Sequence, residues 1–192
     1  MNNIYSDNSM QLVLYGGLMI ALLLSSVTDL YKRRIPNLVT GPAILMALLT
    51  YGYIGGLEGF FFSLRGLSFG LVIFLVPYCL GGMGAGDVKL MSVVGAVLGW
   101  SQTLLALLFI ALCGGVIALG LMISRGTTKQ TMSRLLMSLL FFGAYGDAAQ
   151  LKVNKEDNRD GIPYALAITG GVSLFFIYQL LDQGTLPGWA GL

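Results

Sequence analysis

Histidine is absent from this sequence of 192 residues, and with it the commonest side chain of enzyme active sites. Catalysis by a serine or cysteine that histidine activates is therefore excluded, and so is a metal held by histidine ligands. Cysteine is almost as scarce, since the chain has only Cys79 and Cys113. Each lies singly in an apolar run, without the paired spacing of a zinc site. We interpret both as buried small hydrophobic residues. We expect no metal and no cofactor.

Charged residues are also few. They make up 10% of the chain, whereas hydrophobic residues make up 56%, and the mean hydropathy is +0.79. This balance excludes an ordinary soluble domain. Apolar runs recur along the whole length, so we expect residues 1–192 to form a single integral membrane domain. It should be surrounded by membrane lipid, and we expect no nucleic acid as a partner.

The apolar runs predict an all-α fold, a polytopic membrane bundle of about six transmembrane helices. The predicted spans are residues 11–27, 38–53, 66–80, 88–99, 103–123 and 162–181. The first run lacks the basic region and the cleavage site of a signal peptide, so it should remain in the mature protein.

Basic residues predict the orientation of the bundle. They gather between the first and second spans and between the fifth and sixth: Lys32, Arg33, Arg34, Arg125, Lys129, Arg134, Lys152, Lys155 and Arg159. The positive-inside rule places both loops in the cytoplasm and leaves Arg65 alone on the other side. We therefore expect a multi-pass protein of the cytoplasmic membrane with both termini outside. The apolar stretch 132–142 is too short to span, and we interpret it as an interfacial or re-entrant helix.

Two aspartates adjoin the ends of strongly apolar spans. Asp29 closes the first span and Asp87 opens the fourth, and the predicted topology places both on the cytoplasmic side at about the same depth. Carboxylates in hydrocarbon are expensive, so such residues indicate a functional site. Each has a plainer reading alone: Asp29 as the charge partner of the basic residues after it, and Asp87 as a helix cap. Their placement on the same side favours the site.

A pair of neighbouring carboxylates can hydrolyse a peptide bond. The two cannot both ionise cheaply, so they share a proton. The ionised partner takes a proton from water while the protonated partner polarises the amide carbonyl. Gly84 and Gly86, before Asp87, would let an extended substrate approach. The fourth span is about 18 Å long as a helix, against a hydrocarbon core of about 30 Å, which predicts a site at the membrane boundary.

Two other residues near this site have plainer interpretations. Lys89 is two residues from Asp87 and does not share its helix face, so we interpret it as a side chain that reaches the membrane interface. Tyr164 would lie on the same side of the membrane, where tyrosine is an ordinary interface anchor.

Three segments resemble the prepilin peptidases, which are polytopic aspartyl proteases of the GxGD class. They are Asp29 followed by Ile35-Pro36-Asn37, the stretch GAGDVKL at 84–90, and IPYALAI at 162–168. The resemblance implies removal of the short basic leader of type IV prepilins or related pseudopilins on the cytoplasmic side, with Asp29 and Asp87 as the catalytic pair. The substrates would be prepilin-type membrane proteins.

One departure from the family concerns zinc. Larger bacterial members carry a cytoplasmic insertion whose paired cysteines bind zinc, and many also N-methylate the new terminus. Here only residues 31–37 separate the first two spans, so zinc is not expected, and the sequence leaves methylation open. The short length is similar to that of the prepilin peptidases of Flp (tight adherence) pilus systems.

Several other functions stay open at this point. A proton-coupled transporter or channel component also uses membrane carboxylates and glycine-interrupted helices. A non-catalytic assembly subunit would pair its aspartates with neighbouring cations. An archaeal preflagellin peptidase, or an intramembrane protease of the presenilin kind, would share the GxGD element.

Overall fold

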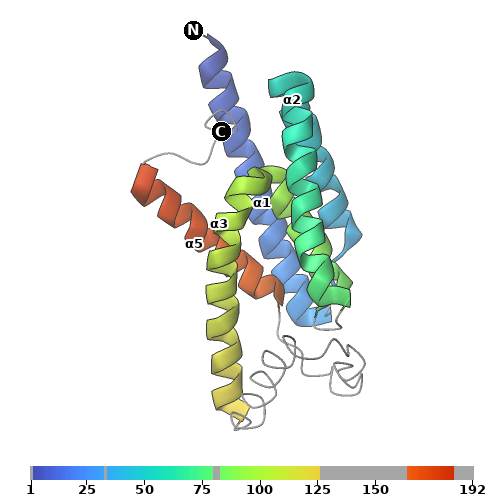
Figure 1. Cartoon of the computed structure of the whole chain (residues 1–192), viewed down its shortest axis with the longest axis vertical. Coiled ribbons are helices and arrows are strands. Elements are labelled where there is room, and N and C mark those ends of the chain that lie inside the picture. Colours follow the sequence, from blue (N-terminus) through green and yellow to red (C-terminus); the bar gives the residue numbers. More distant parts are fainter. Residues whose placement is uncertain (1, 33, 80–82, 126–163, 184–192) are drawn as a thin grey trace, which may run out of the picture.

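The computed structural model describes residues 2–32, 34–79, 83–125 and 164–183 (Figure 1). These form four helices, α1 (Asn2–Lys32), α2 (Asn37–Cys79), α3 (Ala85–Arg125) and α5 (Tyr164–Gln183). Each has a stretch long and apolar enough to cross a membrane, which confirms the expected all-helical multi-pass fold. The stretch 132–142, interpreted above as an interfacial helix, lies outside the described residues.

The predicted count of about six spans is slightly too high for continuous helices, because the described residues form four. Two pairs of predicted spans are merged, 38–53 with 66–80 in α2 and 88–99 with 103–123 in α3. The residues between the members of each pair are helical, except for a single glycine in each helix. The sequence therefore predicts where each helix is interrupted, but it predicts longer loops than the single glycine found in each helix.

The two exceptional glycines are Gly56 in α2 (φ 59°, ψ −138°) and Gly99 in α3 (φ 72°, ψ 172°). Glycine adopts positive φ without steric cost, whereas other residues do not. At Gly56 the chain turns back on itself, because a Cβ on Gly59 would meet the backbone oxygen of Tyr51, which a straight helix would hold about 12 Å away. Both α2 and α3 reverse direction in this way in Figure 1.

The connection between α1 and α2 is short. A residue before proline disfavours the helical conformation, and Pro36 follows the end of α1 closely. The carbonyl of Pro36 then accepts hydrogen bonds from the N–H groups of Val39 (3.0 Å) and Thr40 (3.4 Å). Pro36 therefore directly precedes α2 and accepts its first hydrogen bonds.

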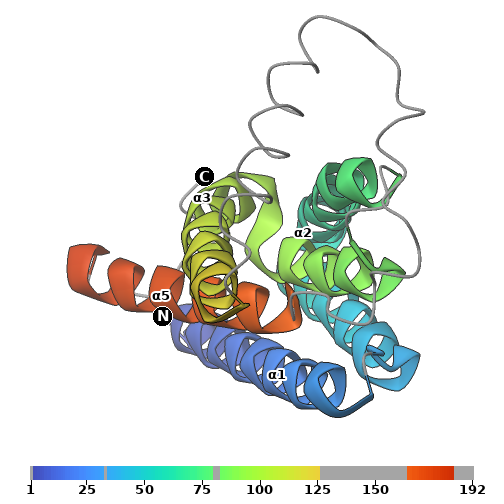
Figure 2. The ribbon, with the colours of Figure 1, turned by 90° about the horizontal axis from the view of Figure 1, so that it is seen from below.

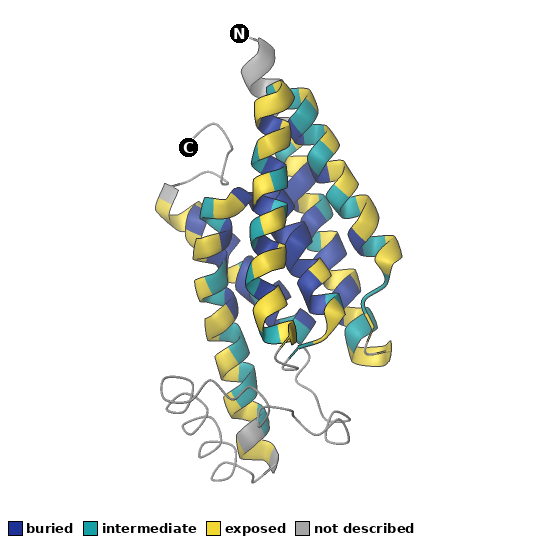
Figure 3. Cartoon of the chain, turned by 45° about the vertical axis from the view of Figure 1, so that its right-hand side comes forward, coloured by how far each residue is buried: buried dark blue, intermediate teal, exposed yellow. Residues whose placement is uncertain are grey.

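The first half of α3 is the centre of the bundle. Every residue from 90 to 99 is buried, and dark-blue residues fill the middle of the molecule in Figure 3. A helix that is buried all round needs no polar face. Close packing with α2 depends on small residues, because a Cβ on Gly66 or on Gly95 would meet the carbonyl oxygen of the other.

Helices α1 and α5 lie side by side and run antiparallel (Figure 2). Ser26 donates a hydrogen bond to the carbonyl of Ala165 (3.0 Å), and the rings of Tyr15 and Phe176 pack with centroids 5.4 Å apart. The start of α5 therefore lies beside the end of α1, and the far ends of both helices lie at the opposite end of the bundle. The predicted location of the termini outside the cell stays a prediction.

The cysteines only partly follow their interpretation as buried residues. Cys79 is exposed and Cys113 is intermediate. The reason is that the outward faces of membrane helices meet lipid, where a thiol behaves as a small hydrophobic group.

Candidate active site

Asp87 lies in the first turn of α3. Its N–H donates to the carbonyl of Gly84 (3.2 Å), and its Oδ2 accepts a hydrogen bond from the N–H of Gly84 (3.2 Å). The side chain thus reaches back to the residue that opens the helix, as the acidic residue of a capping box does. Because the side chain is only 7% exposed, this turn holds a buried carboxylate in a defined orientation.

Asp29 lies near the end of α1 and is partly buried. It continues a buried stripe of that helix that includes Leu18, Leu22 and Ser25, so it faces the bundle. The carboxylates of Asp29 and Asp87 lie within electrostatic range of each other. The two aspartates that the sequence singles out therefore lie at the same end of the bundle, although they belong to different helices.

The start of α2 packs against the same turn. A Cβ on Gly86 would lie 3.0–3.2 Å from three side-chain carbons of Ile35, so the missing side chain makes room for Ile35. Lys89 donates a hydrogen bond of 2.8 Å from Nζ to the side-chain oxygen of Asn37. Its interpretation as an interface residue is therefore incomplete, since it is exposed but also joins two helices. The predicted role of Gly84 and Gly86 in substrate approach stays a prediction.

Tyr164, the first residue of α5, completes the site. It is half-buried, and it lies within electrostatic range of Asp87. The sequence predicts that it lies on the same side as the aspartates, but we interpreted it only as an interface anchor. Its position directly after Pro163, at a helix start that faces the aspartates, was the available signal. All three segments quoted for the family resemblance therefore contribute residues to one end of the bundle.

Two other features of the described residues help to locate the chemistry. No group of three or more histidine, cysteine, aspartate or glutamate side chains among them could hold a metal ion. A cavity of about 670 Å³ lies between α1 and α2, lined by Met10, Val13, Leu49, Thr50 and Tyr53. It is apolar, and its α1 residues lie far along that helix from Asp29, so we do not assign it to the candidate active site.

Residues 17–119 match the model of the type IV leader peptidase family, and this region contains both Asp29 and Asp87. The chain belongs to this family. It is also 28% identical over 159 residues to the prepilin leader peptidase/N-methyltransferase of Bacillus subtilis (strain 168), over 82% of this chain and 52% of that protein. The chain thus spans about half the length of this curated relative. No solved structure matches it.

Proposed function

We propose that this protein is a type IV prepilin leader peptidase that works as an aspartic endopeptidase of the GxGD class. The observation that carries the proposal is the location of Asp29 and Asp87 at the same end of the bundle, in the last part of α1 and the first turn of α3, within electrostatic range of each other. Membership of the leader peptidase family supports the reaction class. The name of the Bacillus relative supports prepilin-type membrane proteins as substrates.

The aspartate pair would hydrolyse the peptide bond with one shared proton. The ionised carboxylate removes a proton from a water molecule, whose oxygen attacks the carbonyl carbon of the scissile bond. The protonated carboxyl group donates its proton to the carbonyl oxygen, which gives a tetrahedral intermediate. In the collapse of this intermediate, the carboxyl group that took the water's proton donates it to the leaving nitrogen, a hydroxyl proton of the intermediate returns to the other carboxylate, and the C–N bond breaks. The hydrogen bond from the N–H of Gly84 would hold the carboxylate of Asp87 in one orientation during these steps.

The site would face the cytoplasm in the cytoplasmic membrane. Exposed cations surround this end of the bundle, namely Lys32, Arg34 and Lys89, and cytoplasmic loops of membrane proteins carry an excess of such residues. Asp87 lies at the start of a short helical segment that ends at Gly99. A substrate helix in the same membrane would therefore present its cytoplasmic end to the pair.

The hydrogen bonds of Asp87 are those of a helix cap and do not pair it with a cation, which argues against an assembly subunit. An assembly subunit would pair its aspartates with neighbouring cations. Instead, Oδ2 of Asp87 is held by a backbone N–H, and the nearby Lys89 bonds to Asn37. A carboxylate fixed by a backbone donor keeps its charge available for a substrate or a water molecule.

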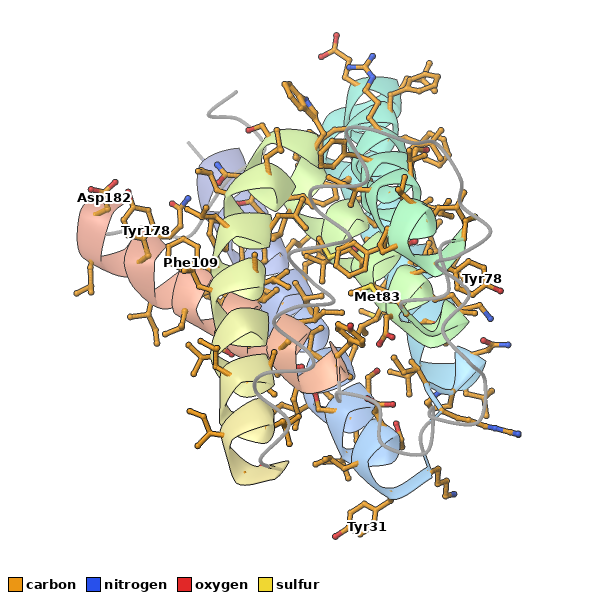
Figure 4. The ribbon with its side chains drawn as sticks, turned by 60° about the horizontal axis from the view of Figure 1, so that its bottom comes forward. Tyr31, Tyr78, Met83, Phe109, Tyr178 and Asp182 are labelled. Atoms are coloured by element: carbon orange, nitrogen blue, oxygen red, sulfur yellow. The ribbon has the colours of Figure 1, made fainter. Side chains whose placement is uncertain are left out.

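Co-expression with a tagged prepilin tests the proposal. Asp29→Asn and Asp87→Asn should each abolish the shift of the pilin to its mature size on a gel, while the protein still accumulates in the membrane. Asp182→Asn is the matched control, because Asp182 lies far from Met83, which precedes the Gly84 turn (Figure 4). Normal processing by either of the first two variants would show that the pair is assigned incorrectly.

A further inference from the structure

Ser25 is a buried serine of α1 whose hydroxyl group has no protein partner. The residue is 0% exposed, and its Oγ makes no hydrogen bond to any group in the described part of the chain. Burial of an unpaired hydroxyl group is costly. Such a group in a native structure calls for a physical explanation.

Several other hydroxyl groups in these helices are satisfied within their own helix. Ser92 donates to the carbonyl of Val88 (2.8 Å), and Ser173 donates to the carbonyl of Thr169 (2.8 Å). This bond to the preceding turn is the usual solution for a serine within a membrane helix. Ser25 could use the same solution, but its side chain is oriented differently.

The location of Ser25 points to the aspartate pair. It precedes Asp29 by four residues, so the two side chains are neighbours on one face of α1. Helical side chains lean toward the N-terminus, so the carboxylate of Asp29 leans toward Ser25. The adjacent Ser26 bonds to Ala165 of α5. Since Ser25 is also buried, it faces the remaining neighbours of α1, which are α2 and α3.

We propose that Ser25 is a positioning residue for Asp29, and that its hydroxyl group holds a water molecule beneath that carboxylate. A buried water needs at least two polar partners, and Ser25 Oγ and the Asp29 carboxylate supply them on one helix face. The water would limit rotation of the carboxylate and keep it turned toward Asp87. This inference rests on the proposed function, because it assigns a role within the same aspartate pair.

The opposite explanation gives an opposite prediction. If the hydroxyl group is simply unsatisfied, Ser25→Ala removes a buried polar group without a partner and stabilises the protein. If the hydroxyl group holds a water against Asp29, the same change removes a hydrogen bond and disturbs the carboxylate. Stability and turnover therefore separate the two explanations.

The experiment compares purified Ser25→Ala, Ser25→Thr and Ser68→Ala for cleavage of a prepilin. Ser68 is a matched control, since it is exposed and donates to the carbonyl of Leu64 (2.9 Å). We expect Ser25→Ala to lower kcat about tenfold, which one lost hydrogen bond in the transition state can cause, with KM and the thermal midpoint unchanged. Ser25→Thr, which keeps the hydroxyl group, should retain most of the kcat.

Two outcomes would overturn this inference. One is a Ser25→Ala enzyme with the kcat of Ser68→Ala and a raised thermal midpoint. The other is an equal loss of kcat and stability in Ser25→Ala and Ser25→Thr, which would indicate packing alone. Asp29→Asn and Asp87→Asn are measured alongside. If those two are inactive while Ser25→Ala is fully active, the proposed function stands and only the role of Ser25 fails.

Discussion

The ammonium group of Lys89 in α3 donates a hydrogen bond of 2.8 Å to the side-chain oxygen of Asn37, the first residue of α2. Lys89 lies two residues after Asp87. Asn37 lies two residues after Ile35, whose side chain packs against Gly86. The bond therefore ties the start of the helix that carries Asp87 to the start of α2.

Loss of this bond should slow cleavage. We expect Lys89→Met to lower kcat/KM about threefold to tenfold, because the position of Asp87 becomes less fixed. Adding Asn37→Ala should cost little more, since both changes remove one interaction. Arg65→Met, at an exposed cation of α2 far along the chain from both aspartates, is the control. Initial rates of leader removal measure the effect, and a double variant with fully additive losses would argue against the coupling.

Gly86 should tolerate a side chain only if Ile35 becomes smaller. An alanine Cβ at 3.0–3.2 Å from the Ile35 carbons is tighter than an ordinary contact, so Gly86→Ala should push the start of α3 away from α2 and lower cleavage about tenfold. Ile35→Ala in the same chain should restore most of the rate. Gly115→Ala, where a Cβ meets nothing, is the control. Failure of Ile35→Ala to rescue would show that Gly86 acts through something other than this contact.

The contact between Gly66 and Gly95 should limit stability rather than turnover. A Cβ on Gly95 would meet the backbone oxygen of Gly66, so Gly95→Ala must separate α2 from α3 and lower the thermal midpoint in detergent. Gly16→Ala is the matched control, because a Cβ there meets nothing and alanine favours a helix over glycine by about 1 kcal/mol. Equal midpoints for the two variants would contradict the close backbone packing.

Tyr51 makes a buried hydrogen bond that stabilises the far end of the bundle. Its hydroxyl group donates to the carbonyl of Val97 at 2.7 Å, and its ring packs edge-on against Phe62. Tyr51→Phe keeps the ring and removes this bond together with the side-chain hydrogen bond to Tyr15, and should destabilise the protein by roughly 0.6 kcal/mol per bond, the average for such bonds in membranes. Tyr53→Phe, at an exposed position, should be neutral. Equal thermal midpoints would show that the bonds contribute nothing.

Much of this arrangement is readable from the sequence, and the reasons are physical. Hydrophobic runs reveal membrane helices because the bilayer requires them, and the basic residues orient them. These two signals place Asp29 and Asp87 on the same side. The turns at Gly56 and Gly99 were harder to read, because one glycine at positive φ replaces the loop that the polar and glycine-rich stretches suggest.

The finer details depend on packing between helices, which one sequence does not encode locally. The sequence around Gly86 does not predict that its missing side chain accommodates Ile35. The sequence around Lys89 does not predict its hydrogen bond to Asn37. Likewise, only the fold shows that the Ser25 hydroxyl group lacks a hydrogen-bond partner while the adjacent Ser26 bonds to Ala165 of α5. Such contacts join residues far apart in the chain, so they require the fold.

Single and double substitutions of the aspartates test the central claim most directly. Purified Asp29→Asn, Asp87→Asn and the double variant are incubated with a prepilin, and mass spectrometry quantifies the released leader. If the two carboxylates act as one unit, each single variant loses all measurable turnover and the double variant loses no more. Cleavage at the same bond by either single variant, at a rate near that of Asp182→Asn, would contradict the claim.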